Sequence, residues 1–184
     1  MQYTNAGPGL KKMFIAQIGS VICSVLLIIP LINLIAMAGA LVFLIISLIG
    51  LYQAGKDIGG CQKAFQFTIA QLVLSVISNF AGSGFMGTLV SVAYSVTGFL
   101  VTYFVCSSVA EVLRMRSHDD IASRGELVWK LNLVCYAVNI IVSVLSHIPL
   151  LNILTGPAGI IVPVASLIAG ILFITFLYRS SEAL

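Results

Sequence analysis

Charged side chains are scarce in this sequence. Lys, Arg, Asp and Glu together make up 8% of the residues, whereas hydrophobic residues make up 60%. A soluble domain covers its surface with about 25% charged residues, so this composition excludes an ordinary soluble fold. The mean hydropathy of +1.13 indicates a chain surrounded by lipid.

Cysteine is also sparse and shows no pattern. Cys23, Cys61, Cys106 and Cys135 are isolated, and no Cys-x-x-Cys spacing occurs. Neither a disulfide framework nor a zinc site is therefore predicted. The alternative is that the last three converge with His118 on a metal ion.

Signatures of catalysis and of cofactor binding are missing. The glycines of GKDIGG (55–60) lack the spacing of a phosphate-binding loop. Side chains of SHDD (117–120) are potential metal ligands, but adjacent residues in a charged loop usually only solvate it. The apolar stretches contain no paired carboxylates and no nucleophile–base pair. We therefore expect no enzyme, no cofactor and no metal site.

The net charge of +3 comes from loops rather than from a folded basic face, so no nucleic acid is expected as a partner.

Long apolar runs are what the sequence has instead. Three runs, Met13–Tyr52, Phe67–Ala110 and Leu131–Tyr178, contain no Lys, Arg, Asp or Glu. A spanning helix needs about 20 residues, and each run is about twice that long and interrupted near its middle by Pro, Asn or Gly. Helices satisfy their own backbone hydrogen bonds in lipid. The predicted fold is an all-α polytopic membrane protein with six transmembrane helices, at 13–30, 34–53, 66–80, 86–108, 131–149 and 153–178.

The predicted helices form one transmembrane domain over residues 1–184. It comprises three hairpins at about 12–54, 64–110 and 130–178, with a charged cytoplasmic loop at 111–130. A cleaved signal peptide has an apolar region of about 7–15 residues. The first run exceeds that length before the first small-residue site at Ala36–Ala38, so we expect it to be an anchor.

The distribution of charge predicts the orientation. Every Lys, Arg, Asp and Glu lies at a terminus or in the loops around Lys56–Lys63 and Glu111–Lys130. The turns near Asn33, Gly82–Gly84 and Leu150 carry no charge. Basic residues stay on the cytoplasmic side of a membrane. Both termini and both charged loops are therefore predicted to be cytoplasmic.

An internal repeat relates the first hairpin to the last. A shift of 119 residues aligns IPLIN (29–33) with IPLLN (148–152) and Ser47 with Ser166 without a gap. The middle hairpin aligns less clearly, through Ser75 and Ser24. Because each copy has two helices, the copies point the same way, as in parallel repeats about an axis along the membrane normal. Proline ends a helix, and we expect Asn33 and Asn152 to cap the next one.

A polar stripe follows the odd-numbered helices. In the fifth helix, polar residues recur every three to four positions and so share one face. The repeat alignment places polar residues at equivalent positions of helices one and three. The resulting candidate pathway or pocket comprises Gln17, Ser20, Ser24, Gln71, Ser75, Asn79, Tyr136, Asn139, Ser143 and His147.

Two interpretations of this stripe stay open. Polar side chains can simply join helices by hydrogen bonds, worth about 0.6 kcal/mol each, or they can line a pocket that widens towards Asn79 and His147. The stripe contains no permanent charge, which disfavours an ion-coupled transporter. His147 is either a structural residue or a proton-sensitive one.

Pro163 must kink or break the sixth helix, and the freed carbonyls are either satisfied internally or bind a ligand.

One stretch indicates kinship. LYQAGKDIGGCQKAF (51–65) follows a long apolar helix and resembles the first inner loop of small, uncharacterised multi-pass (six-helix) bacterial membrane proteins. The resemblance covers mainly residues 13–65. It implies a protein of the bacterial cytoplasmic membrane and carries no activity or site residues. Size and helix number are similar to those of the substrate-binding subunits of energy-coupling-factor vitamin transporters, in architecture only.

The sequence thus predicts an integral membrane protein that acts as a small transport or channel-type unit, with a polar face on helices one, three and five. The alternative is a non-transporting assembly or accessory protein that binds partner membrane proteins or lipid. An intramembrane enzyme is the third possibility. The lipid bilayer is the expected partner, and glycines such as Gly39, Gly50 and Gly98 would suit a homo-oligomer or a partner membrane protein.

Overall fold

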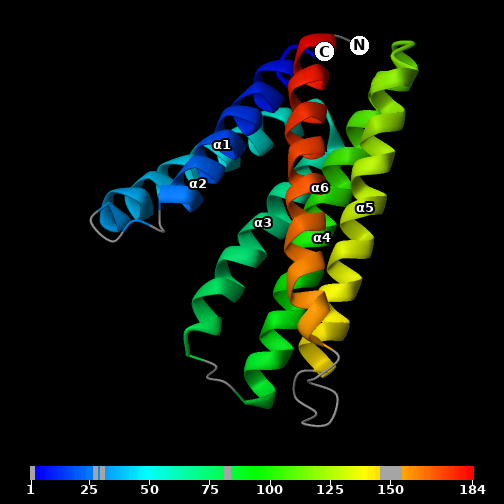
Figure 1. Ribbon diagram of the computed structural model, residues 1–184. Coiled ribbons are helices and arrows are strands. Elements are labelled where there is room, and N and C mark those ends of the chain that lie inside the picture. The colour runs from blue at the N-terminus through cyan, green and yellow to red at the C-terminus, as the bar shows by residue number, and fades with distance from the viewer. Residues whose placement is uncertain (1–2, 27–28, 30–31, 81–83, 146–154) are drawn as a thin grey trace.

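The protein is a bundle of long helices. The computed structural model describes residues 3–26, 29, 32–80, 84–145 and 155–184, and these residues form six α-helices and no strand (Figure 1). The predicted all-α class is confirmed. The helices are α1 (Ala6–Leu26), α2 (Asn33–Gly55), α3 (Gly59–Ser78), α4 (Phe85–Met115), α5 (Asp119–Leu145) and α6 (Thr155–Ala183).

Five of these helices are long and apolar enough to cross a membrane. They are α1, α2, and the parts of α4, α5 and α6 at Met86–Met115, Asp119–Val142 and Pro163–Ala183. The sequence predicted six such spans. Helix α3 is not among the five, since its 20 residues include Lys63 and three glutamines.

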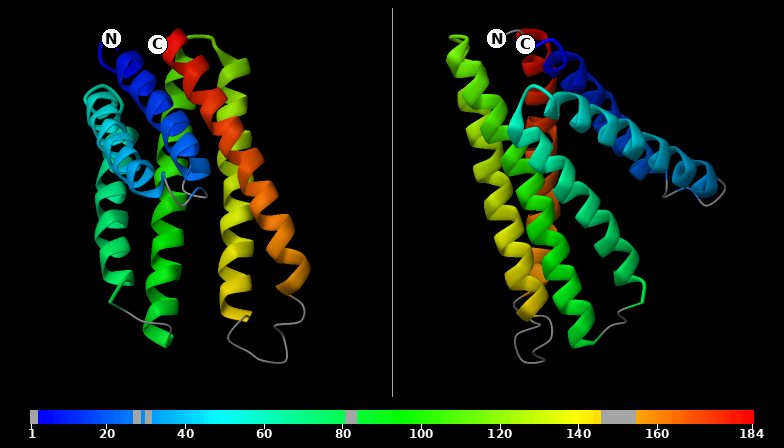
Figure 2. Two further views of the ribbon diagram at one scale, coloured as in Figure 1. Left: turned by 60° about the vertical axis from the view of Figure 1, so that its left-hand side comes forward. Right: turned by 180° about the vertical axis from the view of Figure 1, so that it is seen from behind.

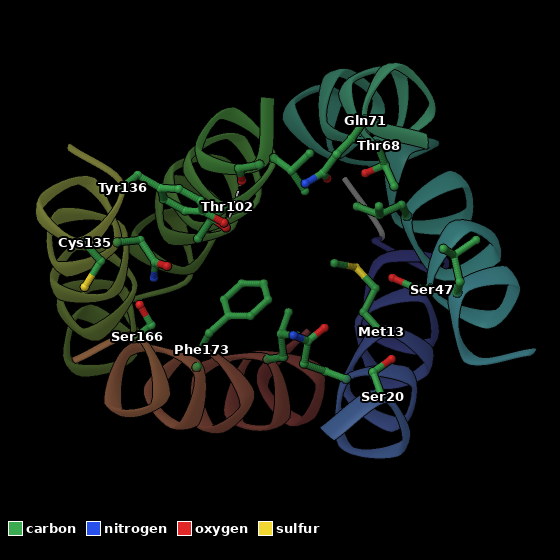
Figure 3. A pocket seen from close by; sticks show the side chains of 18 of the residues that line it. Met13, Ser20, Ser47, Thr68, Gln71, Thr102, Cys135, Tyr136, Ser166 and Phe173 are labelled. Carbon is green, nitrogen blue, oxygen red and sulfur yellow. Dashed lines mark hydrogen bonds between the residues drawn. The ribbon is translucent and has the colours of Figure 1, made fainter. Parts of the chain in front are cut away.

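The six helices close into a ring in chain order. Each helix packs against the next, and α1 packs against α6 to complete the circle. Figure 3, which looks into the ring, shows the helices around a central space. Helices α3 to α6 run side by side, whereas the α1–α2 hairpin leans away from them (Figures 1 and 2).

One end of the ring carries both chain termini and the charged turns. The described terminal residues lie there together with the turn between α2 and α3 and the turn between α4 and α5 (Figure 2). The buried core is concentrated in the same half, where its largest side chains include Leu10, Leu113 and Phe176. Towards the other end large apolar side chains are exposed, such as Leu34 at 83% and Phe80 at 85%. An apolar outer surface of this kind is suited to lipid.

Helices α1 and α2 approach each other through glycine. A Cβ atom on Gly9 would lie 2.6 Å from the backbone nitrogen of Ala54 and 2.7 Å from the carbonyl oxygen of Gly50. A Cβ on Gly50 would in turn lie 2.7 Å from the carbonyl oxygen of Gly9. Small residues allow such backbone contact between helices. The α1–α2 hairpin is therefore joined most tightly near the charged end.

The predicted charged loop at 111–130 is mostly helical, which corrects the sequence analysis. Helix α4 continues to Met115 and α5 begins at Asp119, so only a short turn separates them. Asp119 and Asp120 occupy the first turn of α5, where negative charge complements the helix dipole. Arg114 on α4 also forms an ion pair with Glu126 on α5. The change from apolar to charged sequence therefore does not mark the end of either helix.

The predicted helix cap at Asn33 and the predicted interruption at Pro163 differ from the structure. Asn33 is the first residue of α2, and the cap position, Ile32, makes no side-chain cap hydrogen bond, so the predicted Asn33 cap is wrong. Its counterpart Asn152, like His147, lies outside the described residues. The sequence predicted that Pro163 kinks or breaks the sixth helix; α6 runs through Pro163 without ending there, so the helix is not broken at this residue.

Candidate functional site: a polar cavity inside the helix ring

A cavity of about 420 Å³ lies inside the ring, and all six helices contribute to its wall (Figure 3). This volume is within the range of small-molecule sites, about 300–1,000 Å³. The residues that line it are Met13, Gln17, Ser20, Leu44, Ser47, Leu51, Thr68, Gln71, Gly98, Val101, Thr102, Asn132, Cys135, Tyr136, Asn139, Ser166, Gly170, Phe173 and Leu177.

Half of the predicted polar stripe meets at this cavity. Gln17 and Ser20 reach it from α1, Gln71 from α3, and Tyr136 and Asn139 from α5. Because α1, α3 and α5 alternate around the ring, these residues approach from three directions across the space (Figure 3). The helix faces that the periodicity indicated for these five residues are thus faces that line the cavity.

The remaining members of the stripe do not line the cavity or are not described. Ser24 is exposed and its hydroxyl donates to the carbonyl of Ser20 at 2.8 Å. Ser75 donates to the carbonyl of Leu72 at 2.8 Å, and the exposed Asn79 amide donates to the Ser75 carbonyl at 3.0 Å. The side chain of Ser143 and all of His147 lie outside the described residues. Of the two residues towards which a widening was predicted, Asn79 does not line the cavity, and His147 cannot be placed because it lies outside the described residues.

The even-numbered helices contribute polar residues that the stripe omitted. Ser47 on α2, Thr102 on α4 and Ser166 on α6 all line the cavity. Ser47 and Ser166 are equivalent positions in the 119-residue alignment, which was the available signal for them. Ser47 and Ser166 each stand alone in a long apolar run, so periodicity within one helix could not identify them.

Two polar side chains converge on the backbone of α4 at Gly98. A Cβ atom on this glycine would lie 2.9 Å from Nε2 of Gln71 and 3.0 Å from the hydroxyl oxygen of Tyr136. Gly98 is buried between α3 and α5, the helices that carry these side chains. The absence of a side chain at Gly98 therefore creates the room in which the amide and the phenol come together.

Much of the hydrogen-bonding capacity of the wall is unused. Thr68, Thr102 and Asn132 donate to carbonyls of their own helices, Ala64, Gly98 and Val128, at 2.8, 3.4 and 3.0 Å. By contrast, the side chains of Gln17, Gln71, Tyr136 and Asn139 make no hydrogen bond to any other part of the chain that the structure describes. Amide and hydroxyl groups that face a cavity without partners are available to water or to a solute.

The cavity carries no formal charge. Among the described residues, its lining includes amides, hydroxyls, a thiol and aromatic rings, but no Lys, Arg, His, Asp or Glu. The charged residues lie towards the charged end of the ring, and two of them, Lys63 and Glu111, line a separate open pocket. An ion would enter the cavity without a counter-charge, which is costly away from water. The chemistry therefore favours an uncharged polar solute.

A metal centre is not formed by the described part of the chain. No group of three or more His, Cys, Asp or Glu residues there is placed to hold a metal ion. Cys61 and Cys106 are free and buried in the core, whereas Cys135 is free and lies at the cavity wall. The hypothesis of a shared metal site with His118 therefore has no geometric support among these residues.

Comparison with known proteins provides no relative from which a function can be transferred. No family model, no curated protein and no solved structure matches the chain. The resemblance of residues 51–65 to small bacterial membrane proteins stays an expectation. Function is inferred from the cavity itself.

Proposed function

We infer that this chain is a multi-pass protein of the bacterial cytoplasmic membrane that acts as a small transport or channel-type unit for an uncharged polar solute. The observation that supports this proposal most strongly is the cavity of about 420 Å³, because polar groups from all six helices line it. A bundle held together only by hydrogen bonds between helices would pair those groups with one another. Here Gln17, Gln71, Tyr136 and Asn139 have no such partner in the described residues.

In the proposed topology both termini are cytoplasmic and all six helices cross the bilayer. Helix α3 completes the ring between α2 and α4. It would cross despite its lower hydropathy because Thr68 and Gln71 face the cavity rather than lipid. Intramembrane polar residues generally face a bundle interior or a water-filled space. The three hairpins would then be parallel pseudo-repeats about the ring axis.

A swelling assay on proteoliposomes tests the transport function. Vesicles that contain the protein should swell in glycerol or urea faster than empty vesicles and should remain impermeable to NaCl. Ser47→Leu places an apolar side chain at the cavity wall and should slow swelling, whereas Ser91→Leu changes an exposed serine of α4 outside the cavity and should not. Equal rates for vesicles with and without protein would contradict transport and favour an assembly or accessory role.

A further inference from the structure

The pair formed by Gln71 and Tyr136 offers a defined hydrogen-bonding site within the cavity. Both side chains lie against Gly98 of α4: Gln71 approaches from α3 and Tyr136 from α5, the helices on either side of α4. An amide supplies two N–H donors and one acceptor, and a phenol supplies one donor and one acceptor. The carbonyl of Gly98 accepts from the Thr102 hydroxyl at 3.4 Å, and neither Gln71 nor Tyr136 has a side-chain hydrogen bond to the described part of the chain. The two side chains are therefore left to bind a molecule in the cavity.

The wall across from this pair, on α1 and α6, includes an aromatic ring and apolar side chains beside its polar groups. Phe173 of α6 points its ring into the space, and Met13 projects from α1 towards it (Figure 3). Tyr136 adds a second ring on the other side (Figure 3). Flat apolar surfaces favour a flat molecule, since aromatic contacts are worth about 0.5–1.5 kcal/mol beyond the area that they bury.

We propose that the cavity binds a small, uncharged, planar molecule with an amide-type group, whose carbonyl and N–H groups pair with Gln71 and Tyr136 while its ring packs against Phe173. This inference rests on the proposed transport function and specifies its substrate class. A carboxylate of the same shape would bring a charge into a site with no cation in its lining. An apolar ring without the amide would displace water from Gln71 and Tyr136 without replacing its hydrogen bonds, and would gain only packing.

Binding of benzamide to the protein in lipid nanodiscs, followed by ligand-observed NMR, tests this substrate class. Benzoate and toluene serve as the anionic and the apolar analogue. Benzamide should bind, whereas benzoate and toluene should bind at least about tenfold more weakly, since one lost hydrogen bond to a buried polar group is of that order. Benzoate or toluene binding as tightly as benzamide would contradict the proposal.

Three variants locate the binding. Gln71→Leu and Tyr136→Phe each remove one partner, and Tyr136→Phe keeps the ring, so that both should weaken benzamide about tenfold. Gln66→Leu makes the same change as Gln71→Leu on α3 at an exposed residue outside the cavity and should leave binding unchanged. Thermal unfolding of each variant checks that it is folded. Wild-type affinity in folded Gln71→Leu and Tyr136→Phe would contradict the assigned site.

The swelling assay separates failure of this inference from failure of the proposed function. If glycerol enters protein-containing vesicles faster than empty ones but benzamide does not bind, the transport function stands and the amide-type substrate is wrong. If no solute enters and benzamide does not bind, the transport function is wrong and the inference that rests on it is wrong as well.

Discussion

The carboxylate of Asp57, in the turn between α2 and α3, holds Asn5 at the start of α1. One oxygen accepts hydrogen bonds from the backbone N–H groups of Asn5 and Ala6 at 2.6 and 3.0 Å, and the other accepts from the Asn5 side-chain amide at 3.1 Å. The first N–H groups of a helix have no partner within it. A residue from a different part of the chain thus provides the cap, and it fixes α1 to the α2–α3 turn.

Replacement of Asp57 should destabilise the charged end. Burial opposes ionisation, but the hydrogen bonds from Asn5 and Ala6 outweigh it and hold the pKa of Asp57 below its usual value of 3.8. The carboxylate therefore stabilises the fold at neutral pH, and this contribution is lost as pH falls through the lowered pKa. Asp57→Asn should lower the free energy of unfolding at pH 7 by about 1 kcal/mol.

Thermal unfolding in detergent as a function of pH measures this effect. The difference between wild type and Asp57→Asn should shrink as the pH is lowered towards 3. Glu111→Gln, a change at an exposed carboxylate of α4, serves as control and should leave the stability at pH 7 nearly unchanged. A constant difference at every pH would show that the charge of Asp57 is not what stabilises α1.

The contact between Gly9 and Gly50 should not tolerate a methyl group. Gly9→Ala would place its Cβ less than 3 Å from backbone atoms of α2, which cannot move as a side chain can. We expect a loss of about 1–3 kcal/mol in stability, typical of overpacking. Gly59→Ala is the matched control, since no atom lies within 4 Å of its Cβ position. Thermal unfolding of the two variants compares them; equal stability would mean that the helices are not held this closely.

Leucine at Gln71 or Asn139 distinguishes a solute cavity from simple helix packing. If these amides joined helices, each substitution would cost about 0.6 kcal/mol or more in stability. Because neither side chain makes a hydrogen bond within the described chain, we expect a change of less than about 0.5 kcal/mol, as at positions without a lost partner. Unfolding temperatures of Gln71→Leu and Asn139→Leu test this expectation. A clear loss of stability in both variants would favour the interpretation that these amides join helices.

Cysteine labelling in whole cells tests the orientation. On a background without native cysteines, Asp120→Cys at the start of α5 should react with a membrane-impermeant maleimide only after the cells are opened. Gly84→Cys, before α4, should react in intact cells. Both positions are exposed. Labelling of Asp120→Cys in intact cells would reverse the proposed topology.

The helices were predictable because their signal is local. Apolar runs and the polar residues within them gave the six helices and the cavity-facing positions Gln17, Gln71 and Tyr136. The predicted loop at 111–130 was wrong because helix propensity and the Arg114–Glu126 ion pair extend α4 and α5 beyond the apolar region. Composition locates the apolar part of a helix and not its end.

Part of the predicted stripe lies away from the cavity for a different reason. Ser24 and Asn79 continue the faces of Gln17 and Gln71, yet they do not line the cavity. Towards the end of the ring opposite the chain termini, the α1–α2 hairpin leans away from α3 (Figure 2). The angle between hairpins depends on tertiary packing, such as that at Gly9 and at Asp57, and no periodicity within one helix encodes it. For the same reason, the meeting of Gln71 and Tyr136 at Gly98 could not be predicted.

Alkylation of Cys135 is the most direct test of the central claim that the cavity admits an uncharged polar solute. Both cysteines are buried, but Cys135 belongs to the cavity wall, whereas Cys106 lies in the packed core with an exposed fraction of 0%. Two variants, each with one of these cysteines and alanine at the other three, are treated in lipid with iodoacetamide, which is neutral, or iodoacetate, which is an anion. The thiolate that reacts forms only where water reaches the sulfur. We predict that iodoacetamide modifies Cys135 much faster than Cys106, and that iodoacetate does not share this advantage. Cys135 as unreactive as Cys106 towards iodoacetamide would mean a dry interior and would contradict the account.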